Sequence, residues 1–208
     1  RTPLAVLRSE AEVARRAPET TTVEAFGRVV LGETTRLEGL VEDLLSLARA
    51  DERKLAGART AAPTELDVDN VVLAEADRTR RLPVDRSQVS AGRVIGRVDD
   101  LARAVGHLLD NAARHGERRV AVGVRTEGER VRIWVDDDGS GIPEEDRERI
   151  FDRFQRLDEA RSRDRGGSGL GLAVVAETAA AMGGTATAGR SPLGGARIEL
   201  ALPAAPAG

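Results

Sequence analysis

The spacing of apolar residues divides the chain into an N-terminal helical part and a longer part of alternating strands and helices. From Leu4 to about Arg16, apolar residues share one helical face, and a second helical pattern runs from about Val23 to Ala50. Its apolar positions, four and three residues apart, are Phe26, Val30, Leu37, Leu40, Leu44 and Leu47, with Glu33 interrupting the series. This stripe is typical of coiled coils and bundles.

The two predicted helices are separated by a short polar run with a proline, residues 17–22, which predicts an antiparallel hairpin over residues 1–50. A single hairpin leaves its apolar stripe exposed. We therefore expect residues 1–50 to pair with a second copy in a dimeric four-helix bundle. Residues 51–63 have no sustained pattern and are expected to be a linker.

The pattern after the linker predicts an α+β domain over residues 64–203, with a mixed sheet and helices on one face. Strands are expected at 65–68, 82–84, 92–98, 118–126, 129–136, 185–188 and 196–202. Helices are expected at about 70–80, at 100–114 with Asp99 as the cap, and at 170–182, ended by Gly183-Gly184. Residues 204–208 are expected to be a frayed tail.

Composition excludes several classes of function. The net charge of −3, with 32% charged residues of both signs, gives no electrostatic footprint for nucleic acid or an anionic membrane. No cysteine is present, so there is no disulfide or thiolate chemistry, and two histidines provide too few ligands for an ordinary zinc site. No run is long and apolar enough to span a bilayer. The chain begins at Arg1, inside a helical pattern, so we expect a fragment of a longer protein.

Two glycine clusters, in residues 135–143 and 166–172, suggest a nucleotide pocket. The first follows an alternating strand pattern, where glycine lets the backbone approach a ligand closely. The second opens into a helix, whose N-terminal N–H groups favour an anion. The arginine-rich segment between them has about the length of a mobile lid. Neither cluster is a Walker A loop or a dinucleotide fingerprint.

Four blocks follow one another in the second part of the chain: His-Leu-Leu-Asp-Asn-Ala-Ala-Arg-His at 107–115, Asp-Asp-Gly-Ser-Gly at 137–141, Phe151 with Phe154, and Gly-Ser-Gly-Leu-Gly-Leu at 167–172. With these blocks in this order, the chain resembles the cytoplasmic core of two-component sensor histidine kinases. Residues 1–50 resemble its dimerisation and phosphotransfer hairpin. Residues 64–203 resemble its catalytic domain, an α/β sandwich of the GHKL type that binds ATP with Mg²⁺. The resemblance covers nearly the whole chain.

The family's N-box is matched by residues 107–115. The resemblance implies that Asn111 holds Mg²⁺, with a helix-surface amide as the alternative, and that Arg114 reaches phosphate oxygens. His107 stands where the family often has a second asparagine, so it is a candidate for metal or phosphate contact; a helix histidine near the pocket is the alternative. His115 is placed in the nucleotide site, or else acts as a partner of the helix dipole.

The family's G1 box, Asp-x-Gly-x-Gly, is matched by residues 137–141. The resemblance implies that Asp137 accepts a hydrogen bond from the exocyclic amino group of adenine. An ionised carboxylate only accepts, so it selects an amino group over a carbonyl at that place, adenine over guanine. Three consecutive aspartates leave the register open by one residue, and the glycine spacing favours Asp137. Asp136 and Asp138 are expected to be solvated or near metal. Gly139, Gly141 and Ile142 complete this side of the site.

The F-box and G2 box flank the expected lid. Phe151 and Phe154 match the F-box, and both are expected to make apolar packing contacts. Arg156 resembles the lid arginine that faces the γ-phosphate, with Arg161, Arg163 and Arg165 as competitors for that role. The residues expected to cradle phosphates are Gly167, Ser168, Gly169, Leu170, Gly171 and Leu172.

The first residues, Arg1-Thr-Pro-Leu, resemble the end of the family's H-box, His-Glu-Leu-Arg-Thr-Pro. The resemblance implies that the phosphoacceptor histidine lies three residues before Arg1. Thr2 falls where the family has a threonine that orients water for hydrolysis of the regulator's aspartyl-phosphate; an ordinary first-turn threonine is the alternative. The expected catalytic residues are thus Asn111, Arg114, Arg156 and Thr2.

The implied function is transfer of the ATP γ-phosphoryl group to a hairpin histidine and then to an aspartate of a response-regulator receiver domain. The fragment itself should bind ATP without autophosphorylating. It is expected to lie at the cytoplasmic face of the membrane, below an upstream membrane sensor. The alternatives are a nucleotide-sensing dimer that acts mainly as a regulator phosphatase, and another GHKL ATPase, such as a chaperone or topoisomerase module, although those lack such a hairpin.

Overall fold

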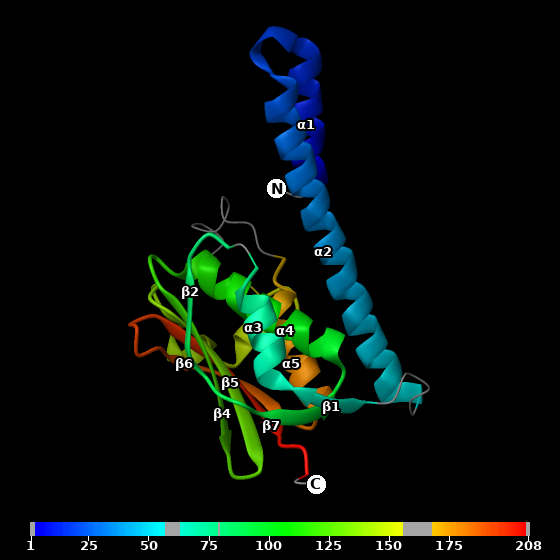
Figure 1. Ribbon diagram of the computed structural model, residues 1–208. Helices are drawn as coiled ribbons and strands as arrows, with labels where there is room; N and C mark the ends of the chain where they lie inside the picture. The colour runs from blue at the N-terminus through cyan, green and yellow to red at the C-terminus, as the bar shows by residue number, and fades with distance from the viewer. Residues whose placement is uncertain (1–2, 57–62, 79, 156–167, 207–208) are drawn as a thin grey trace.

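The computed structural model describes residues 3–56, 63–78, 80–155 and 168–206. A helical hairpin stands beside an α/β domain (Figure 1). Helices α1 (Pro3–Arg16) and α2 (Val23–Ala56) run antiparallel and are joined through the short helix η1 (Pro18–Thr20). The Thr22 hydroxyl accepts a hydrogen bond from the Ala25 N–H at 3.1 Å, which caps the start of α2. The predicted hairpin is therefore present.

Helix α2 is longer than the pattern predicted. It continues past Ala50 to Ala56, and so takes in the first part of the segment that was expected to be a linker. Residues 51–56 contain strong helix formers and no glycine or proline, so nothing in them ends the helix before Gly57. The apolar spacing ends near Ala50, which had suggested a linker, but a helix can continue beyond the end of its apolar stripe.

The α/β domain is built on a five-stranded sheet with the order β2-β4-β5-β7-β6. These strands are β2 (Val84–Val89), β4 (Val120–Glu127), β5 (Arg130–Asp137), β6 (Thr185–Arg190) and β7 (Ala196–Pro203). Strands β2 and β4 are parallel and the other neighbours are antiparallel. A separate pair is formed by β1 (Thr64–Asp67) and β3 (Arg93–Gly96).

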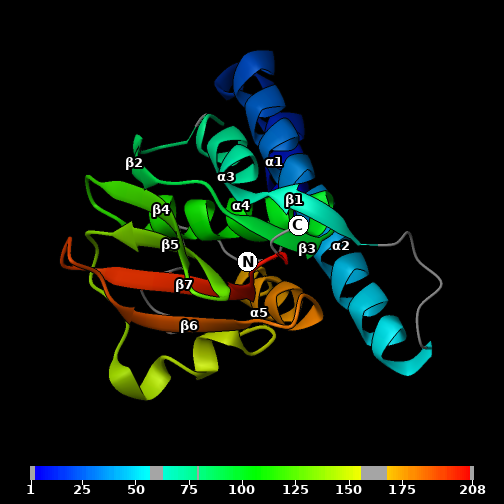
Figure 2. The same cartoon turned by 60° about the horizontal axis from the view of Figure 1, so that its bottom comes forward.

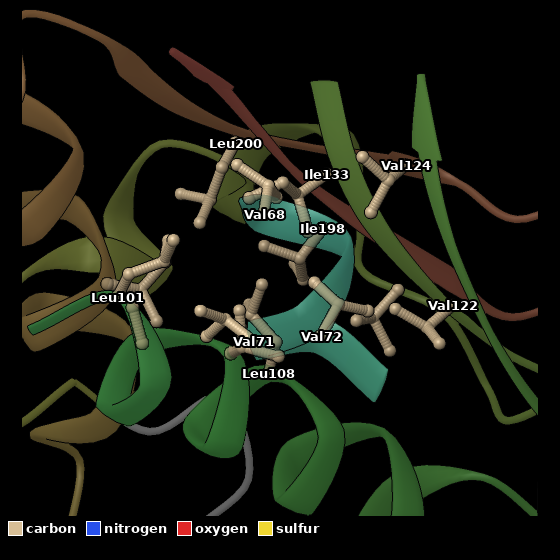
Figure 3. Close-up of a cluster of buried hydrophobic side chains, with 14 of the residues drawn as sticks. Val68, Val71, Val72, Leu101, Leu108, Val122, Val124, Ile133, Ile198 and Leu200 are labelled. Atoms are coloured by element: carbon tan, nitrogen blue, oxygen red, sulfur yellow. The ribbon is translucent and has the colours of Figure 1, made fainter. Parts of the chain in front are cut away.

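Helices α3 (Val68–Ala76), α4 (Val98–His115) and α5 (Gly171–Ala181) cover one face of the sheet (Figures 1 and 2). The main core lies between these helices and the sheet and is aliphatic, in a chain with only 2% aromatic residues. Figure 3 shows Leu101 and Leu108 of α4 pointing toward Ile133 and Leu200 of the sheet, and all four are almost fully buried. The predicted α+β class, with helices on one face, is confirmed.

Several element boundaries differ from the prediction. Helix α4 begins at Val98, with Arg97 at the N-cap position, so Asp99 lies in the first turn and is not the cap. Its carboxylate there still favours the positive end of the helix dipole. Helix α3 ends at Ala76 rather than near Arg80, and β2 begins at Val84, the last residue of the expected 82–84 segment, and continues to Val89.

The predicted frayed tail is ordered for its first residues. The N–H of Ala204 donates to the Glu129 carbonyl at 2.8 Å, and the N–H of Ala205 donates to the Arg93 carbonyl at 2.7 Å. Fraying was expected because the last residues of a domain are often poorly ordered. Its backbone is nevertheless hydrogen-bonded to carbonyls of the neighbouring segments, and a sequence pattern does not reveal such pairings.

Trp134 lies on the sheet face away from the helices, since its neighbours Ile133 and Val135 point into the core. It is opposite Gly123 in the β4–β5 register. A Cβ at Gly123 would collide with the indole ring. The Arg197 guanidinium lies 5.4 Å from the ring centroid on the other side. Trp134 thus packs against Gly123, which has no side chain, and against the Arg197 cation, and only 7% of its surface is exposed.

Asp138 ties the end of β5 to the segment that follows α4. Its Oδ1 accepts hydrogen bonds from the backbone N–H groups of Glu117, Arg118 and Arg119 at 2.9, 3.0 and 3.1 Å. These bonds, with those from Arg118 and Arg119 the strongest, lower the pKa of the Asp138 carboxyl to about 2. The C-terminal end of α4 is thereby held against the loop that carries the first glycine cluster.

Substitution of Gly123 by alanine should destabilise the protein by about 1–3 kcal/mol, because the new Cβ must displace the Trp134 ring. Gly189→Ala is the matched control, since nothing lies within 4 Å of a Cβ there. The control should be neutral or stabilising by up to about 1 kcal/mol. Urea unfolding followed by far-UV circular dichroism measures both, and equal effects would contradict the packing described for Trp134.

The Asp138 hydrogen bonds should make stability depend on acid pH. Because the pKa is about 2 in the folded protein and 3.8 as the ordinary value, the stabilising contribution is present above pH 3.8 and is lost as pH falls toward 2. Asp138→Asn should therefore be less stable than the parent at pH 5, with the difference shrinking between pH 4 and 2. Urea midpoints across this range measure it; a constant difference would refute the role of the charge.

Candidate nucleotide-binding site

Asp137, at the end of β5, is a buried carboxylate with 4% of its surface exposed. Its Oδ1 accepts hydrogen bonds from the N–H groups of Gly139 at 2.9 Å and Ala196 at 3.1 Å. Burial raises the pKa of Asp137 above its ordinary value, and these two hydrogen bonds act in the opposite direction. Both bonds use Oδ1, which leaves Oδ2 to accept from a ligand.

The backbone around Asp137 is packed too closely for side chains. A Cβ on Gly139 would meet the carbonyl oxygen of His115, and a Cβ on Gly195 would meet Asp137 Oδ1. Gly141 has a φ of +74°, which favours glycine. The end of α4, the loop after β5 and the start of β7 therefore converge on one carboxylate; we call Gly139, Gly141 and Gly195 the glycine cradle.

Gly195 and Ala196 were missed by the sequence reasoning. The signal available was the glycine pair Gly194-Gly195 immediately before the last strand, which is typical of a turn or a close backbone approach. That pair stood outside the two clusters that drew attention. Its part in the site depends on β7 lying beside β5, which the sequence pattern did not specify.

The three consecutive aspartates have different environments. Asp136 is 2% exposed and accepts two hydrogen bonds from Arg197, at 2.8 and 2.6 Å, on the sheet face away from the helices. Asp138 accepts the three backbone bonds described above. Asp136 is therefore buried and ion-paired rather than solvated, whereas Asp138 is half-buried and fixed by backbone N–H groups. Among the three, only Asp137 faces the glycine cradle, because successive side chains of a strand alternate in direction.

Helix α4 carries the other candidates of the N-box. Asn111 and Arg114 are half-buried, and His115 is exposed with its carbonyl against the glycine cradle. Positions 107, 111 and 114–115 share one helical face. His107 Nε2 lies 2.7 Å from Oδ1 of Asp43 on α2, and a Cβ on Gly171 would lie 3.1 Å from its Nδ1. His107 thus lies between α2 and the start of α5.

The two described ends that flank residues 156–167 are joined. The Phe154 N–H donates to the Gly169 carbonyl at 2.8 Å, and a Cβ on Gly169 would lie 2.8 Å from the Phe154 carbonyl carbon. Phe151 is half-buried and packs against the main core, as expected. Phe154 differs: 65% of its surface is exposed, and its φ of 65° is rare for a bulky residue.

The second glycine cluster leads into α5. The Ser168 hydroxyl accepts a hydrogen bond from the Leu170 N–H at 3.1 Å, and α5 begins at Gly171. Leu170 is 1% exposed and Leu172 is half-buried. The first N–H groups of α5 have no partner within the helix and suit an anion. The candidates Thr2, Arg156 and Gly167, with Arg161, Arg163 and Arg165, lie outside the described residues.

The site's chemistry fits a nucleotide that brings its own metal. Among the residues that the structure describes, no group of three histidine, cysteine, aspartate or glutamate side chains could hold a metal ion. Mg²⁺ keeps most of its ligands as water and phosphate oxygens, so one amide such as Asn111 suffices from the protein.

Within the same described ranges, no helix is long and apolar enough to cross a membrane.

Two family models match the chain. Residues 96–206 match the histidine kinase-, DNA gyrase B- and HSP90-like ATPase family, and residues 1–53 match the His Kinase A phospho-acceptor domain. The sensor-like histidine kinase SenX3 of Mycobacterium tuberculosis is 38% identical over 198 residues, 90% of this chain and 47% of that protein. The sensor histidine kinase CpxA of Escherichia coli K12 is 33% identical over 207 residues, which are 98% of this chain and 44% of that protein. The chain spans about half the length of these curated relatives.

Solved structures of histidine kinases resemble this chain as well. The ATP-binding domain of PrrB from Mycobacterium tuberculosis is 31% identical with a TM-score of 0.59, covering 70% of this chain and 99% of that one. The mycobacterial sensor histidine kinase MprB is 29% identical with a TM-score of 0.61 at the same coverage. The Acinetobacter baumannii kinase AdeS, 20% identical with a TM-score of 0.69 over 97% of this chain and 95% of that one, shares the fold. The chain therefore belongs to the histidine kinase-, DNA gyrase B- and HSP90-like ATPase family and, with its phospho-acceptor hairpin, is the core of a two-component sensor histidine kinase.

Proposed function

We propose that this core is an ATP-dependent protein-histidine kinase of a two-component system. It transfers the γ-phosphoryl group of ATP to a histidine of the hairpin and on to an aspartate of a response-regulator receiver domain. The observation that carries the proposal is Asp137, a buried carboxylate with one oxygen fixed by two backbone N–H groups inside the glycine cradle. The similarity to the sensor histidine kinases SenX3 and CpxA supports it.

Asp137 selects adenine in this proposal. The free Oδ2 accepts a hydrogen bond from the exocyclic amino group, whereas the carbonyl of guanine at that position offers no donor. The pocket wall beside it is backbone, because a Cβ on Gly139 or Gly195 would fill the space or strike Asp137. Ile142 is half-buried and packs against the main core, which places an apolar side chain next to the cradle for the base.

The phosphate end of the nucleotide lies toward Asn111, Arg114 and the start of α5. The Asn111 amide oxygen binds the Mg²⁺ that accompanies ATP, and the bound ion neutralises phosphate charge. Arg114, Arg156 and residues 167–171 hold the phosphate oxygens through guanidinium and backbone N–H donors. His115, at the exposed end of α4, lies on the nucleotide side of the same helix.

In the proposed reaction a histidine ring nitrogen attacks the γ-phosphorus in line. The bond from phosphorus to the bridging oxygen breaks, ADP leaves, and a nitrogen–phosphorus bond forms. The protein contributes position and electrostatic stabilisation, as phosphoryl transfer requires. From the match of residues 1–4 to the H-box, we infer that the acceptor lies upstream of Arg1 in the longer protein.

The partners follow from the hairpin. Exposed apolar side chains on α2, among them Leu31, Val41, Leu44 and Leu45, support a second copy of the hairpin as the cover, giving a homodimer through residues 1–50. The receiver domain of a response regulator is the phosphoryl acceptor, with Thr2 placed to orient water when the regulator is dephosphorylated. The longer protein carries a membrane sensor, with this core on the cytoplasmic side.

Substitution of Asp137 by asparagine should weaken ATP binding by about 10–100-fold, because a hydrogen bond to a charged group contributes about 1.5–3 kcal/mol. Isothermal titration calorimetry of this chain with ATP and Mg²⁺ measures the change. Ser140→Ala, at an exposed position of the same loop, should bind as the parent does. The ratio of ATP to GTP affinity should also fall, and this ratio does not depend on the fraction of folded protein. An unchanged ratio would argue against the adenine contact.

A version extended upstream through the native residues should label with γ-labelled ATP, and the label should be acid-labile and base-stable. The 208-residue chain should bind ATP and stay unlabelled. Label on the shorter chain would overturn the placement of the acceptor. No label on the extended version, despite ATP binding, would favour a regulator phosphatase, and steady ATP hydrolysis without phosphoprotein would favour another GHKL ATPase.

A further inference from the structure

The C-terminal end of α4 lacks the cap that commonly closes a helix. The last carbonyl groups of an α-helix have no partner within the helix, and a residue in the left-handed region often follows and helps to satisfy them. Neither Gly116 nor Glu117, the residues after α4, has a positive φ, and Gly116 is extended, with a φ of −63° and a ψ of 152°. Its N–H donates to the Ala112 carbonyl at 2.7 Å. The carbonyl groups after Ala112 therefore need donors from outside the helix.

Arg81, in the segment between α3 and β2, is such a donor. Its Nε and Nη2 donate to the Ala113 carbonyl at 3.0 and 2.8 Å, and Nη2 also donates to the Gly116 carbonyl. These carbonyls lie at the negative end of the helix dipole, where a cation is favourable. The guanidinium reaches both because its donors form a rigid planar fork. Arg81 thus caps α4 from a position 32 residues earlier in the chain.

Arg80 contacts the preceding turn of the same helix. Its side chain is only 6% exposed, and its Nε donates to Asp110 Oδ1 at 2.8 Å. The same guanidinium donates to the Glu75 carbonyl near the end of α3 and lies 3.7 Å from the Glu75 carboxylate. A cation at this depth is costly unless its donors are used, and these contacts use them. We call Arg80 and Arg81 the arginine pair.

The arginine pair holds α4 at the residues immediately before the proposed phosphate ligands. Asp110 precedes Asn111, and Ala113 precedes Arg114. Side chains on a helix take their direction from the backbone of the turn that carries them. The arginine pair therefore sets where the Asn111 amide and the Arg114 guanidinium lie, although it belongs to a different segment of the chain.

The same end of α4 borders the carboxylate proposed to select adenine. A Cβ on Gly116 would lie 3.4 Å from Asp137 Cβ and 3.3 Å from Cδ1 of Leu82, the residue after Arg81. Gly116 thus lies between the segment of the arginine pair and Asp137. The backbone bonds of Asp138 hold the segment after α4 independently. Loss of Arg81 should therefore loosen the helix end without detaching it.

We propose that Arg81, together with Arg80, is a positioning residue of the nucleotide site. The arginine pair fixes the C-terminal turns of α4, so that Asn111 meets Mg²⁺ and Arg114 meets the phosphate oxygens in one defined arrangement. This inference rests on the kinase function proposed above. Neither arginine touches the nucleotide in this proposal. Their contribution is preorganisation, because a helix end that frays must be ordered when ATP binds, at a cost in affinity.

Hydrogen exchange of single amides tests the cap directly. In Arg81→Gln the Gly116 amide should exchange about tenfold faster, because the last turn of α4 opens more often without the guanidinium. The Leu101 amide, at the start of the same helix, should exchange as in the parent. Arg86→Gln, at an exposed arginine of β2, is the matched control and should change neither amide. An unchanged Gly116 amide in Arg81→Gln would overturn the cap.

Nucleotide binding separates positioning from folding. Isothermal titration calorimetry gives the ratio of ATP affinities in Mg²⁺ and in EDTA, and this ratio does not depend on the fraction of folded protein. In Arg81→Gln the ratio should fall about fivefold to tenfold, because the Asn111 amide no longer meets the metal in one position. Arg81→Lys keeps the charge without the fork, so its ratio should be intermediate. Asp110→Asn, which weakens only the Arg80 contact at a 58% exposed carboxylate, should lower the ratio about twofold.

The remaining outcomes are distinguishable. Arg86→Gln should keep the parent ratio. Faster exchange at Gly116 with an unchanged ratio in Arg81→Gln would overturn the positioning role and leave only a structural cap. Failure of the parent chain to bind ATP would overturn the nucleotide site and the positioning role together. An extended protein that binds ATP but does not label would overturn the kinase function alone, because the affinity ratio still decides the role of the arginine pair.

Discussion

Three segments of the α/β domain converge on one constraint, the burial of the Asp137 carboxylate. A buried carboxylate needs donors, and here Gly139 and Ala196 supply two backbone N–H groups to one oxygen. That arrangement brings the end of α4, the loop after β5 and the start of β7 together so closely that Gly139 and Gly195 have no room for a Cβ. The requirement for glycine at positions 139 and 195 is a consequence of this constraint.

The nucleotide domain and the hairpin are linked by contacts of a different kind. The main core is large, aliphatic and almost fully buried, whereas α2 is held by Leu47 between the Asp43–His107 hydrogen bond and the Asp51–Arg153 ion pair. Contacts of the first kind define the fold; contacts of the second kind exchange with water at little cost. Because the α2 contacts fall on His107, Arg153 and Leu170, a movement of α2 acts directly on the residues around the proposed phosphate segment.

Periodicity predicted the helices and strands well where a pattern was long, as in the hairpin, β4, β5 and α5. It failed at several boundaries. Helix α2 continued beyond its apolar stripe because residues 51–56 are helix formers, and Asp99 proved to be a first-turn residue. Ala204 and Ala205 are hydrogen-bonded to carbonyls that lie nearby in space, and a one-dimensional pattern carries no such information.

The sequence by itself determined the residue types and their local spacing. It placed a glycine cluster after a strand, another before a helix, and a helical hairpin in front, because period and glycine position are local properties. Only the tertiary structure distinguished three adjacent aspartates, by giving Asp136 to Arg197, Asp137 to the glycine cradle and Asp138 to the segment after α4. It alone also brought Asp43 to His107, because a pairing between distant segments is decided by how the helices pack.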